Sequence, residues 1–284
     1  MVKVHPPTPV ELRRGVLAVS VLRDLDIEPA PLGVTLTGPP AVWVPWGECR
    51  RALAGHDPEA ADGRDRLARW LLARRWAADL PHEALLTRLR PVGLPVEHAL
   101  HPGLDWVQVR VLGGALDLGL GAVGLDPSDP DTVVILPPPV LDACGLHADH
   151  RWSDALGYLE RMGGVAAERL ATNAKGLLKP IGDCDVVTLL GARSLRTAIA
   201  QTAGGMGAVV APMRRRGWTR LSLIDPAFGP AAAAATAPAE RGFTRPLLVT
   251  ADELALAAEG GRPEELVLRS PAVDEPWVRD MLYR

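Results

Sequence analysis

The 284-residue chain contains little lysine, asparagine and cysteine, and each shortage narrows what the protein can be. Only three of its 31 basic residues are lysine, asparagine occurs once, and eight of its aromatic side chains are tryptophan. This skew towards arginine is typical of a GC-rich genome, so the arginine content alone does not indicate nucleic-acid binding. The balance of 31 basic against 34 acidic residues excludes a surface that is basic throughout, although it leaves room for a local basic patch.

Three widely spaced cysteines, Cys49, Cys144 and Cys184, do not make a disulfide framework, because they are few and odd in number. Reduced cysteines are typical of a cytoplasmic protein. The longest uncharged stretches, 29–47 and 197–213, are interrupted by proline, glycine and polar residues, so neither is expected to span a membrane. We therefore expect a soluble, cytoplasmic protein that does not bind membranes.

Glycine and proline are plentiful, with 28 and 27 residues, and they suggest how the chain is divided. At about 150 residues per domain, the length predicts two domains or one large one. Residues 91–103 carry three prolines and two glycines and are the expected linker. The linker separates a helix-rich N-terminal portion, residues 1–90, from an α/β domain over residues 104–284.

The spacing of apolar residues predicts the elements of the two parts. In the N-terminal portion we expect helices over 9–25, 64–80 and 81–89 and a short β-hairpin made of 33–38 and 41–46. In the second part we expect strands over 105–112, 115–123, 132–136, 185–190, 208–213 and 247–250, and helices over 140–144, 153–171, 194–203 and 252–258. Apolar strands that alternate with helices predict an α/β fold with a mixed, partly parallel sheet and flanking helices.

Four segments between residues 104 and 257 resemble those of a known group of proteins. They are DWVQVRVLGGALDLGLGAVGL, GDCDVVTLLGARSLRTAI, MRRRGWTRLSLIDPAFGPAAAAAT and RGFTRPLLVTADE. These segments are similar to an uncharacterised protein family of GC-rich actinobacteria. Because that family has no assigned activity, the resemblance supports the broad fold class and implies no catalytic residue.

The candidate ligand site begins directly after the expected strand over 185–190. Gly191 would allow a close backbone approach, and the free N–H groups at the start of the next helix would favour an anion. Ser194 could cap that helix or donate to the anion, and Arg193 and Arg196 would add charge-assisted hydrogen bonds. The turn is not a P-loop, because it lacks the second glycine and the Lys-Ser/Thr pair.

The expected strand over 208–213 would complete this site. If it lies parallel to 185–190 as a neighbour, both strands end at one edge of the sheet, where ligands bind in open α/β folds. The residues that follow it would then join the site: Arg214, Arg215, Arg216 and Trp218. Such a cluster suits a phosphate or a carboxylate attached to a planar group.

The function expected from this cluster is binding, with turnover left open, of a small anionic molecule at the carboxyl edge of the sheet. No base–nucleophile pair is visible, so no catalytic residue is assigned, and no cofactor is expected. A structural interpretation stays open beside it, in which Ser194 is an ordinary N-cap and the arginines form a solvated turn.

Two further patterns have the chemistry of a site without its usual spacing. Cys144, His147 and His150, together with Cys184, are zinc-ligand types, but no paired C-x-x-C is present and no metal is expected. The two carboxylates in residues 182–185 could form an acid/base pair or hold Mg²⁺, although capping a turn is their simpler role.

The alternative function is that of a non-catalytic interaction protein, which would contact a protein or nucleic-acid partner through the basic helix over 64–80. That helix carries Arg64, Arg66, Arg69, Arg74 and Arg75. Acidic residues are interleaved with them, so a solvated helix face is the simpler interpretation and nucleic acid is not the expected partner. The sequence does not define the oligomeric state.

Overall fold

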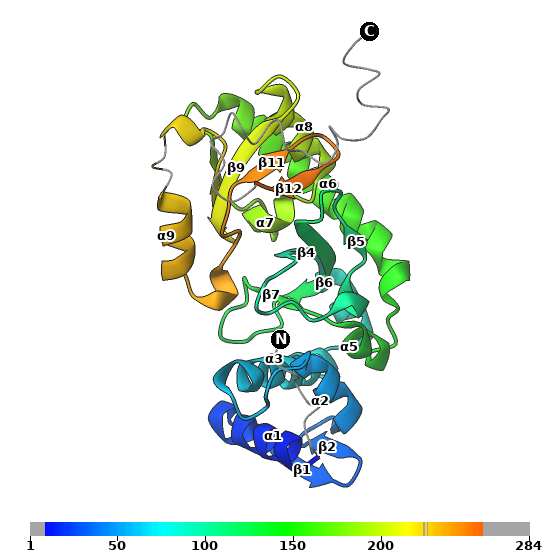
Figure 1. Cartoon of the computed structure of the whole chain (residues 1–284). Helices are drawn as coiled ribbons and strands as arrows, with labels where there is room; N and C mark the ends of the chain where they lie inside the picture. The colour runs from blue at the N-terminus through cyan, green and yellow to red at the C-terminus, as the bar shows by residue number, and fades with distance from the viewer. Residues whose placement is uncertain (1–8, 224, 226, 258–284) are drawn as a thin grey trace, which may run out of the picture.

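A computed structural model describes residues 9–223, 225 and 227–257 and shows helices combined with three antiparallel sheets (Figure 1). An N-terminal unit, residues 9–80, lies at one end of the molecule and the remaining described residues form the rest. None of the helices in the described part of the chain is both long and apolar enough to cross a bilayer.

The N-terminal unit packs helices against a small antiparallel sheet with the strand order β1-β2-β3. Leu12 and Val16 on one helix and Leu67 and Leu71 on another are fully buried, as expected for the apolar faces that the spacing predicted. The helices and the hairpin expected here are confirmed, and β1 is an additional strand. The elements are α1 (Pro9–Arg23), β1 (Ile27–Ala30), β2 (Gly33–Leu36), β3 (Val42–Pro45), α2 (Trp46–Leu53) and α3 (Ala61–Ala78).

A four-stranded sheet follows, and β6 is its central strand. β6 pairs with β4 along one side and with β5 and β7 along the other. Gly113 and Gly114 form the predicted turn between β5 and β6, with φ of +91° and +69°. The elements are α4 (His82–Arg88), β4 (Leu89–Pro95), the 3₁₀ helix η1 (Leu104–Trp106), β5 (Val109–Arg110), β6 (Leu116–Val123), β7 (Val133–Ile135), α5 (Pro138–Ala143) and α6 (Ala148–Thr172).

Part of the segment expected to be a linker, residues 91–103, belongs to this sheet, because residues 91–95 lie in β4. The backbone N–H of Val96 donates to Ala115, so alternate residues of β4 face β6 and the others face away. Pro91 and Pro95 are among those that face away, where a missing N–H costs no ladder bond. The prolines that suggested a linker are therefore compatible with an edge strand.

The last third contains a five-stranded sheet with the order β12-β11-β9-β10-β8. Every strand pair in the three described sheets is antiparallel, so the predicted mixed, partly parallel sheet is wrong. A parallel contact occurs as the isolated bridge of Leu112 with Glu253. The elements are β8 (Leu177–Leu178), α7 (Val186–Leu189), α8 (Arg193–Gln201), β9 (Gly207–Met213), β10 (Arg216–Trp218), η2 (Leu221–Leu223), α9 (Phe228–Ala235), η3 (Pro238–Glu240), β11 (Leu247–Val249) and β12 (Leu254–Leu256).

Two misassigned segments explain the error in strand direction. The expected strand over 185–190 is instead the short helix α7 (Val186–Leu189), whose N-cap Asp185 accepts a hydrogen bond from the Thr188 N–H at 2.7 Å. All four residues of α7 are buried, so no polar face distinguished a helix turn from a buried strand. Residues 252–258 were expected to be a helix, but β12 pairs with β11 in a hairpin that Thr250 closes by accepting the Glu253 N–H.

Two large hydrophobic clusters form the core. One joins the N-terminal unit to β6, α5 and α6, because Leu67 and Leu71 belong to the same cluster as Leu120 and Leu141. The other lies between α6, α7, α8 and the five-stranded sheet. Buried contacts therefore cross the expected linker, while the division of the chain into domains stays a prediction.

The packing of Trp106 on β6 predicts a difference between two glycine substitutions. A Cβ on Gly119 would lie 2.3 Å from the buried Trp106 ring, whereas a Cβ on Gly164 of α6 would meet open space. We expect Gly119→Ala to lower the free energy of unfolding by about 1–3 kcal/mol through overpacking. Gly164→Ala should raise it by up to about 1 kcal/mol through helix propensity. Urea denaturation measures both, and equal effects would contradict the packing.

Candidate functional site

The predicted anion position at the start of α8 is filled by a carboxylate of the protein itself. Glu160 on α6 accepts the backbone N–H of Arg193 at 2.8 Å and that of Ser194 at 3.2 Å. The Ser194 hydroxyl donates to the Glu160 carbonyl at 3.2 Å. The helix N-terminus holds an anion, as its chemistry predicts, but the anion is internal.

The two arginines of α8 hold neighbouring segments together. Arg196 is only 6% exposed, and its guanidinium donates to the carbonyls of Leu190, Gly191 and Ala251 at 3.0, 2.6 and 3.3 Å. Burial lowers the pKa of Arg196. Arg193 forms an exposed ion pair with Asp252 at 2.9 Å. These contacts fasten the β11–β12 turn to α8.

The predicted residues that follow β9 lie far from α8. They are at the carboxyl end of β9, whereas the β11–β12 turn that α8 binds is at its amino end. Asp252 follows β11, whose Val249 pairs with Gly207 at the amino end of β9, whereas Arg214 directly follows the carboxyl end. A strand of seven residues spans roughly 20 Å, so the two groups do not form one site.

The four predicted residues that follow β9 lie in different surroundings. Arg214 donates to Asp185 through Nε at 2.7 Å and forms an ion pair through Nη2 at 2.6 Å. Arg215 and Arg216 are exposed. Trp218 packs edge-on against Phe228, with ring centroids 5.1 Å apart. Only Arg214 and Arg215 border a cavity that is described below.

In the structure, the residues of the metal and acid/base patterns are buried or make contacts with other residues of the chain. Cys184 is fully buried and burial raises its pKa to about 12, which leaves an unreactive thiol. His147 and His150 contact each other edge to face at 5.6 Å. Across residues 9–223, 225 and 227–257, no group of three or more His, Cys, Asp or Glu is placed to hold a metal. Asp183 accepts from Arg90 at 2.5 Å and Asp185 caps α7.

Several arginines of the basic helix α3 donate hydrogen bonds to carbonyls within the molecule. Arg74 is buried and donates to the carbonyls of Trp43 and Pro139, and Arg75 donates to Pro40 at 2.6 Å. These arginines are therefore not free to contact nucleic acid, as the alternative function of this helix would require.

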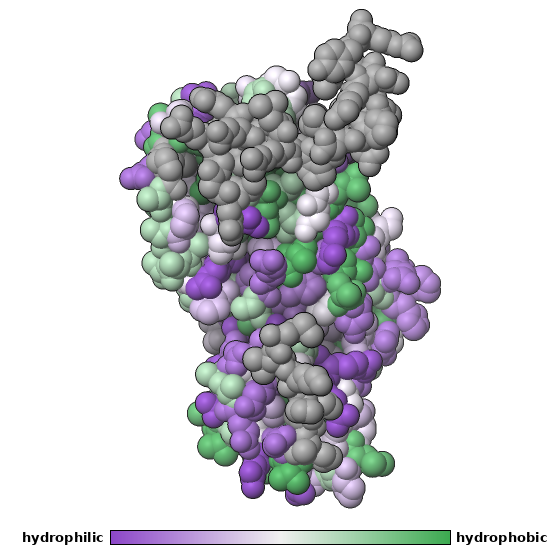
Figure 2. Space-filling view, in the orientation of Figure 1, coloured by the Kyte–Doolittle hydropathy of each residue, from purple (hydrophilic) through white to green (hydrophobic). Residues whose placement is uncertain are grey.

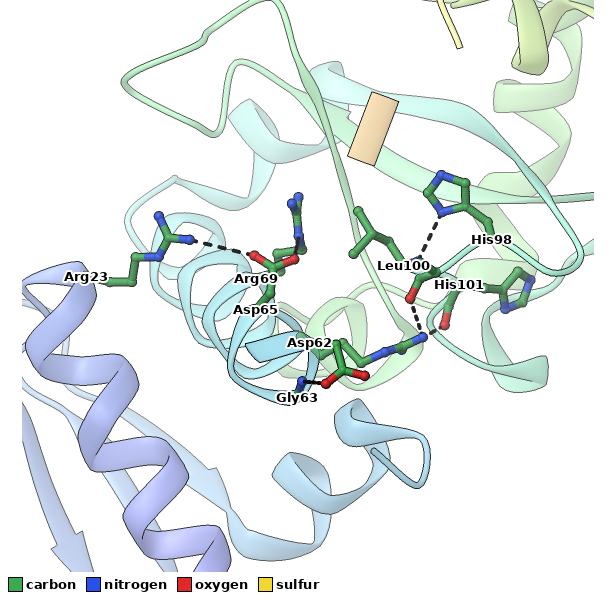
Figure 3. Close-up of polar contacts among 10 residues, drawn as sticks. Arg23, Asp62, Gly63, Asp65, Arg69, His98, Leu100 and His101 are labelled. Carbon is green, nitrogen blue, oxygen red and sulfur yellow. Dashed lines mark hydrogen bonds and ion pairs between the residues drawn. The ribbon is translucent and has the colours of Figure 1, made fainter. Parts of the chain in front are cut away.

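The loop that follows β4, residues 96–103, ties three parts of the molecule together. Arg66 of α3 donates to the carbonyls of Ala99 and His101 at 2.5 and 3.1 Å. His98 donates from Nε2 to the carbonyl of Arg241, and His101 donates from Nε2 to Asp117, each at 3.1 Å. Figure 3 shows both histidines on this loop, with His98 accepting a hydrogen bond from the Leu100 N–H. Sequence reasoning missed this loop, although its His-x-x-His spacing was the visible signal.

A cavity of about 340 Å³, named here the junction cavity, lies between the N-terminal unit and the rest of the chain. Its walls come from α3, from the loop over residues 96–103, from β7 and from Arg214 and Glu240. A smaller hollow of about 70 Å³, which Arg215 borders, shares Arg214 and Glu240 with it. In Figure 2 the surface near this junction is mostly hydrophilic.

A cluster of three charged residues stands on the α3 side of the junction cavity. Asp65 accepts from Arg69 Nε at 2.9 Å and forms an ion pair with Arg23 of α1 at 3.7 Å (Figure 3). One carboxylate cannot neutralise two guanidinium groups, so the Arg23–Asp65–Arg69 cluster has a net charge of +1. Both arginine side chains are about half exposed, at 51% and 50%. Their remaining N–H groups have no hydrogen-bond partner among the described residues.

Apolar groups line much of the junction cavity. Trp76 contributes from α3, Leu100 and Pro102 from the loop, and Val133 and Ile135 from β7. Arrangements of this kind, an apolar wall with a few charged groups at the junction of two structural units, are typical of small-molecule sites.

Compared with models of protein families, with curated proteins and with solved structures, the chain gives no match. The resemblance to the actinobacterial family stays a prediction, and a function must be argued from the geometry of the junction itself.

The binding of the Glu160 carboxylate at the start of α8 predicts that an added anion can stabilise a variant that lacks this side chain. Glu160→Ala removes the acceptor for two helix N–H groups and should lower the free energy of unfolding by about 1 kcal/mol. Sulfate should then occupy the vacated position and raise the melting temperature of the variant more than that of the unsubstituted protein. Chloride at equal ionic strength is the control. An equal response of both proteins to sulfate would contradict the assignment.

The buried loop histidine predicts a pH dependence of stability. Burial, with Arg214 nearby, lowers the pKa of His98 from 6.5 to about 4, while Asp185 opposes this shift. Between these values the unfolded chain binds a proton that the folded chain does not, so stability is full above pH 6.5 and falls as the pH falls. From pH 7 to pH 5 the loss from His98 should be about 2 kcal/mol.

Urea denaturation between pH 5 and pH 7 measures this dependence, and His98→Gln is the matched variant. Its stability should change less with pH than that of the unsubstituted protein, whatever its absolute value. Identical slopes for the two proteins would show that His98 is not buried as a neutral group.

Proposed function

We propose that the protein binds a small molecule that carries a carboxylate or a phosphate on an apolar body, and that the junction cavity is the binding site. The observation that carries this proposal is the net positive Arg23–Asp65–Arg69 cluster beside an apolar wall. The proposal retains the class of ligand expected from the sequence and moves the site away from α8.

The size and the chemistry of the cavity support this ligand class. Its volume of about 340 Å³ lies within the 300–1,000 Å³ typical of small-molecule sites. Arg69 donates to Asp65 only through Nε, so its two Nη atoms can bind both oxygens of a carboxylate or phosphate. Arginine is favoured in this role because its planar group matches both oxygens at once.

The charges around the cavity also orient the ligand. Glu240 and Asp126 also line the cavity, and their carboxylates would repel an anion, whereas the nearby Arg214 already pairs with Asp185. The anionic end of the ligand therefore belongs against Arg69 and Arg23, and its apolar body against Leu100 and β7.

Binding without turnover is the form of the proposal that the lining supports. Among the described residues that line the junction cavity there is no His, Cys, Ser, Lys or Tyr, and the one lining hydroxyl, that of Thr132, donates to Asp129. A nucleophile paired with a base is the usual requirement for hydrolysis or group transfer. We accordingly assign Arg69 and Arg23 as binding residues and propose no catalytic residue.

Calorimetric titration with 2-naphthoate and 2-naphthyl phosphate tests the proposal, with neutral 2-naphthamide as the matched ligand. We expect both anions to bind and the amide to bind at least tenfold more weakly. Arg69→Gln should weaken the anions about tenfold or more, because a charge-assisted pair is lost. Arg64→Gln, on the same helix but outside the cavity lining, is the control and should leave binding unchanged. Equal affinity for the amide and the anions, or an effect of Arg64→Gln as large as that of Arg69→Gln, would overturn the proposal.

A further inference from the structure

The edge of β7 that faces away from β6 carries unpaired backbone groups. Leu136 donates its N–H to the Leu120 carbonyl at 3.0 Å, which makes these two a hydrogen-bonded pair. Because such pairs alternate along an antiparallel ladder, Val134 bonds β6, whereas the N–H and C=O groups of Val133 and Ile135 point away from it. Within the described part of the chain, no group bonds these four outward atoms.

The contrast with the opposite edge of the same sheet shows that the β7 edge is open. On β4, two outward positions are prolines and the outward N–H of Gly93 donates to the Thr188 hydroxyl at 2.9 Å. β7 has neither a proline nor a side-chain partner, and all three of its residues line the junction cavity. Proteins normally cover or blunt such edges, because an open edge pairs with another extended chain.

We propose that the natural ligand of the junction cavity is the carboxyl-terminal end of an extended polypeptide, which adds to the edge of β7 and places its terminal carboxylate at the Arg23–Asp65–Arg69 cluster. This inference rests on the proposed function, because it uses the same cavity and the same cluster. An extended peptide is the ligand whose N–H and C=O groups alternate with the spacing that β7 offers.

Charge complementarity favours the carboxyl-terminal end of a polypeptide as the ligand. The cluster has a net positive charge and free guanidinium N–H groups, and a terminal carboxylate supplies an anion on the backbone itself. The edge of β7 is three residues long, which corresponds to roughly 10 Å of strand. A short edge of this kind engages only a few residues, as suits the last residues of a chain, while apolar side chains fill the space beside Leu100 and Trp76.

The first test is a calorimetric titration of the full chain with the tetrapeptide acetyl-Ala-Val-Ala-Val as its free acid and as its amide. We expect the acid to bind and the amide to bind at least tenfold more weakly. The amide of acetyl-Ala-Val-Ala-Asp carries its carboxylate on a side chain and should not restore the affinity. If that amide binds as tightly as the free acid, the assignment of a chain end is wrong.

The second test places a methyl group on each peptide nitrogen in turn. In a paired strand only alternate N–H groups face the neighbouring strand. Methylation at one set of alternate positions should therefore weaken binding tenfold or more, and methylation at the other set should change it less than twofold. Loss of binding at every position, or at none, would contradict pairing with β7.

A variant of β7 provides the matching test on the protein. Val133→Pro removes an outward N–H without removing a bond to β6, and Val133→Ala controls for loss of the side chain. Val133→Pro should weaken the peptide at least tenfold relative to Val133→Ala, whereas the two variants, which both lack the valine side chain, should bind 2-naphthoate with equal affinity. Thermal melts establish that both variants fold, and the methylation series on the unsubstituted protein decides the matter if they do not.

The outcomes separate this inference from the proposed function. If 2-naphthoate binds and the peptide acid does not, the junction cavity is an anion site and the β7 inference fails. If neither binds, both fail. Peptide binding with alternating sensitivity to methylation, lost in Arg69→Gln, supports both.

Discussion

The geometry of the junction depends on the guanidinium of Arg66, which binds two carbonyls of the loop that follows β4. That loop is in turn fixed to the central sheet, because His101 donates to the fully buried Asp117, which Arg110 also binds through two nitrogens at 2.6 and 2.7 Å. A buried carboxylate is costly unless it is paired and hydrogen-bonded, and here it has both kinds of partner. This chain of contacts sets the distance between α3 and β7 and therefore the width of the junction cavity.

The antiparallel arrangement decides which charged groups meet. It sends the arginines of α8 and those after β9 to opposite ends of one strand, and it leaves the start of α8 to Glu160. In the N-terminal unit, Asp65 pairs with Arg69 one turn later in α3 and also with Arg23 of α1, which leaves the cluster with one net positive charge and several N–H donors without a partner. Burial of a donor against carbonyls makes an arginine structural, as for Arg196, whereas half-exposure beside a cavity leaves it able to bind a ligand.

Local patterns were sufficient for much of the fold. The apolar spacing of α1 and α3 and the Gly113–Gly114 turn identified elements correctly, because each depends on residues close in sequence. The direction of the strands could not be predicted, since it depended on whether residues 185–190 were a strand, and the complete burial of Val186–Leu189 removed the polar face that marks a helix. The candidate site could not be predicted for a different reason: Arg69 lay on a predicted helix and Val133 on a predicted strand, but only the tertiary fold places them on one cavity.

The most direct test of the account is a ¹H–¹⁵N spectrum of the full chain during titration with 2-naphthoate. The side-chain Nε–H signal of Arg69 and the indole signals of Trp70 and Trp76, which line the junction cavity, should move together with one affinity. The indole signal of Trp218, at the end of β9–β10 where the sequence placed the site, should stay in position. Movement of Trp218 without Arg69 and Trp76 would contradict the junction cavity as the binding site.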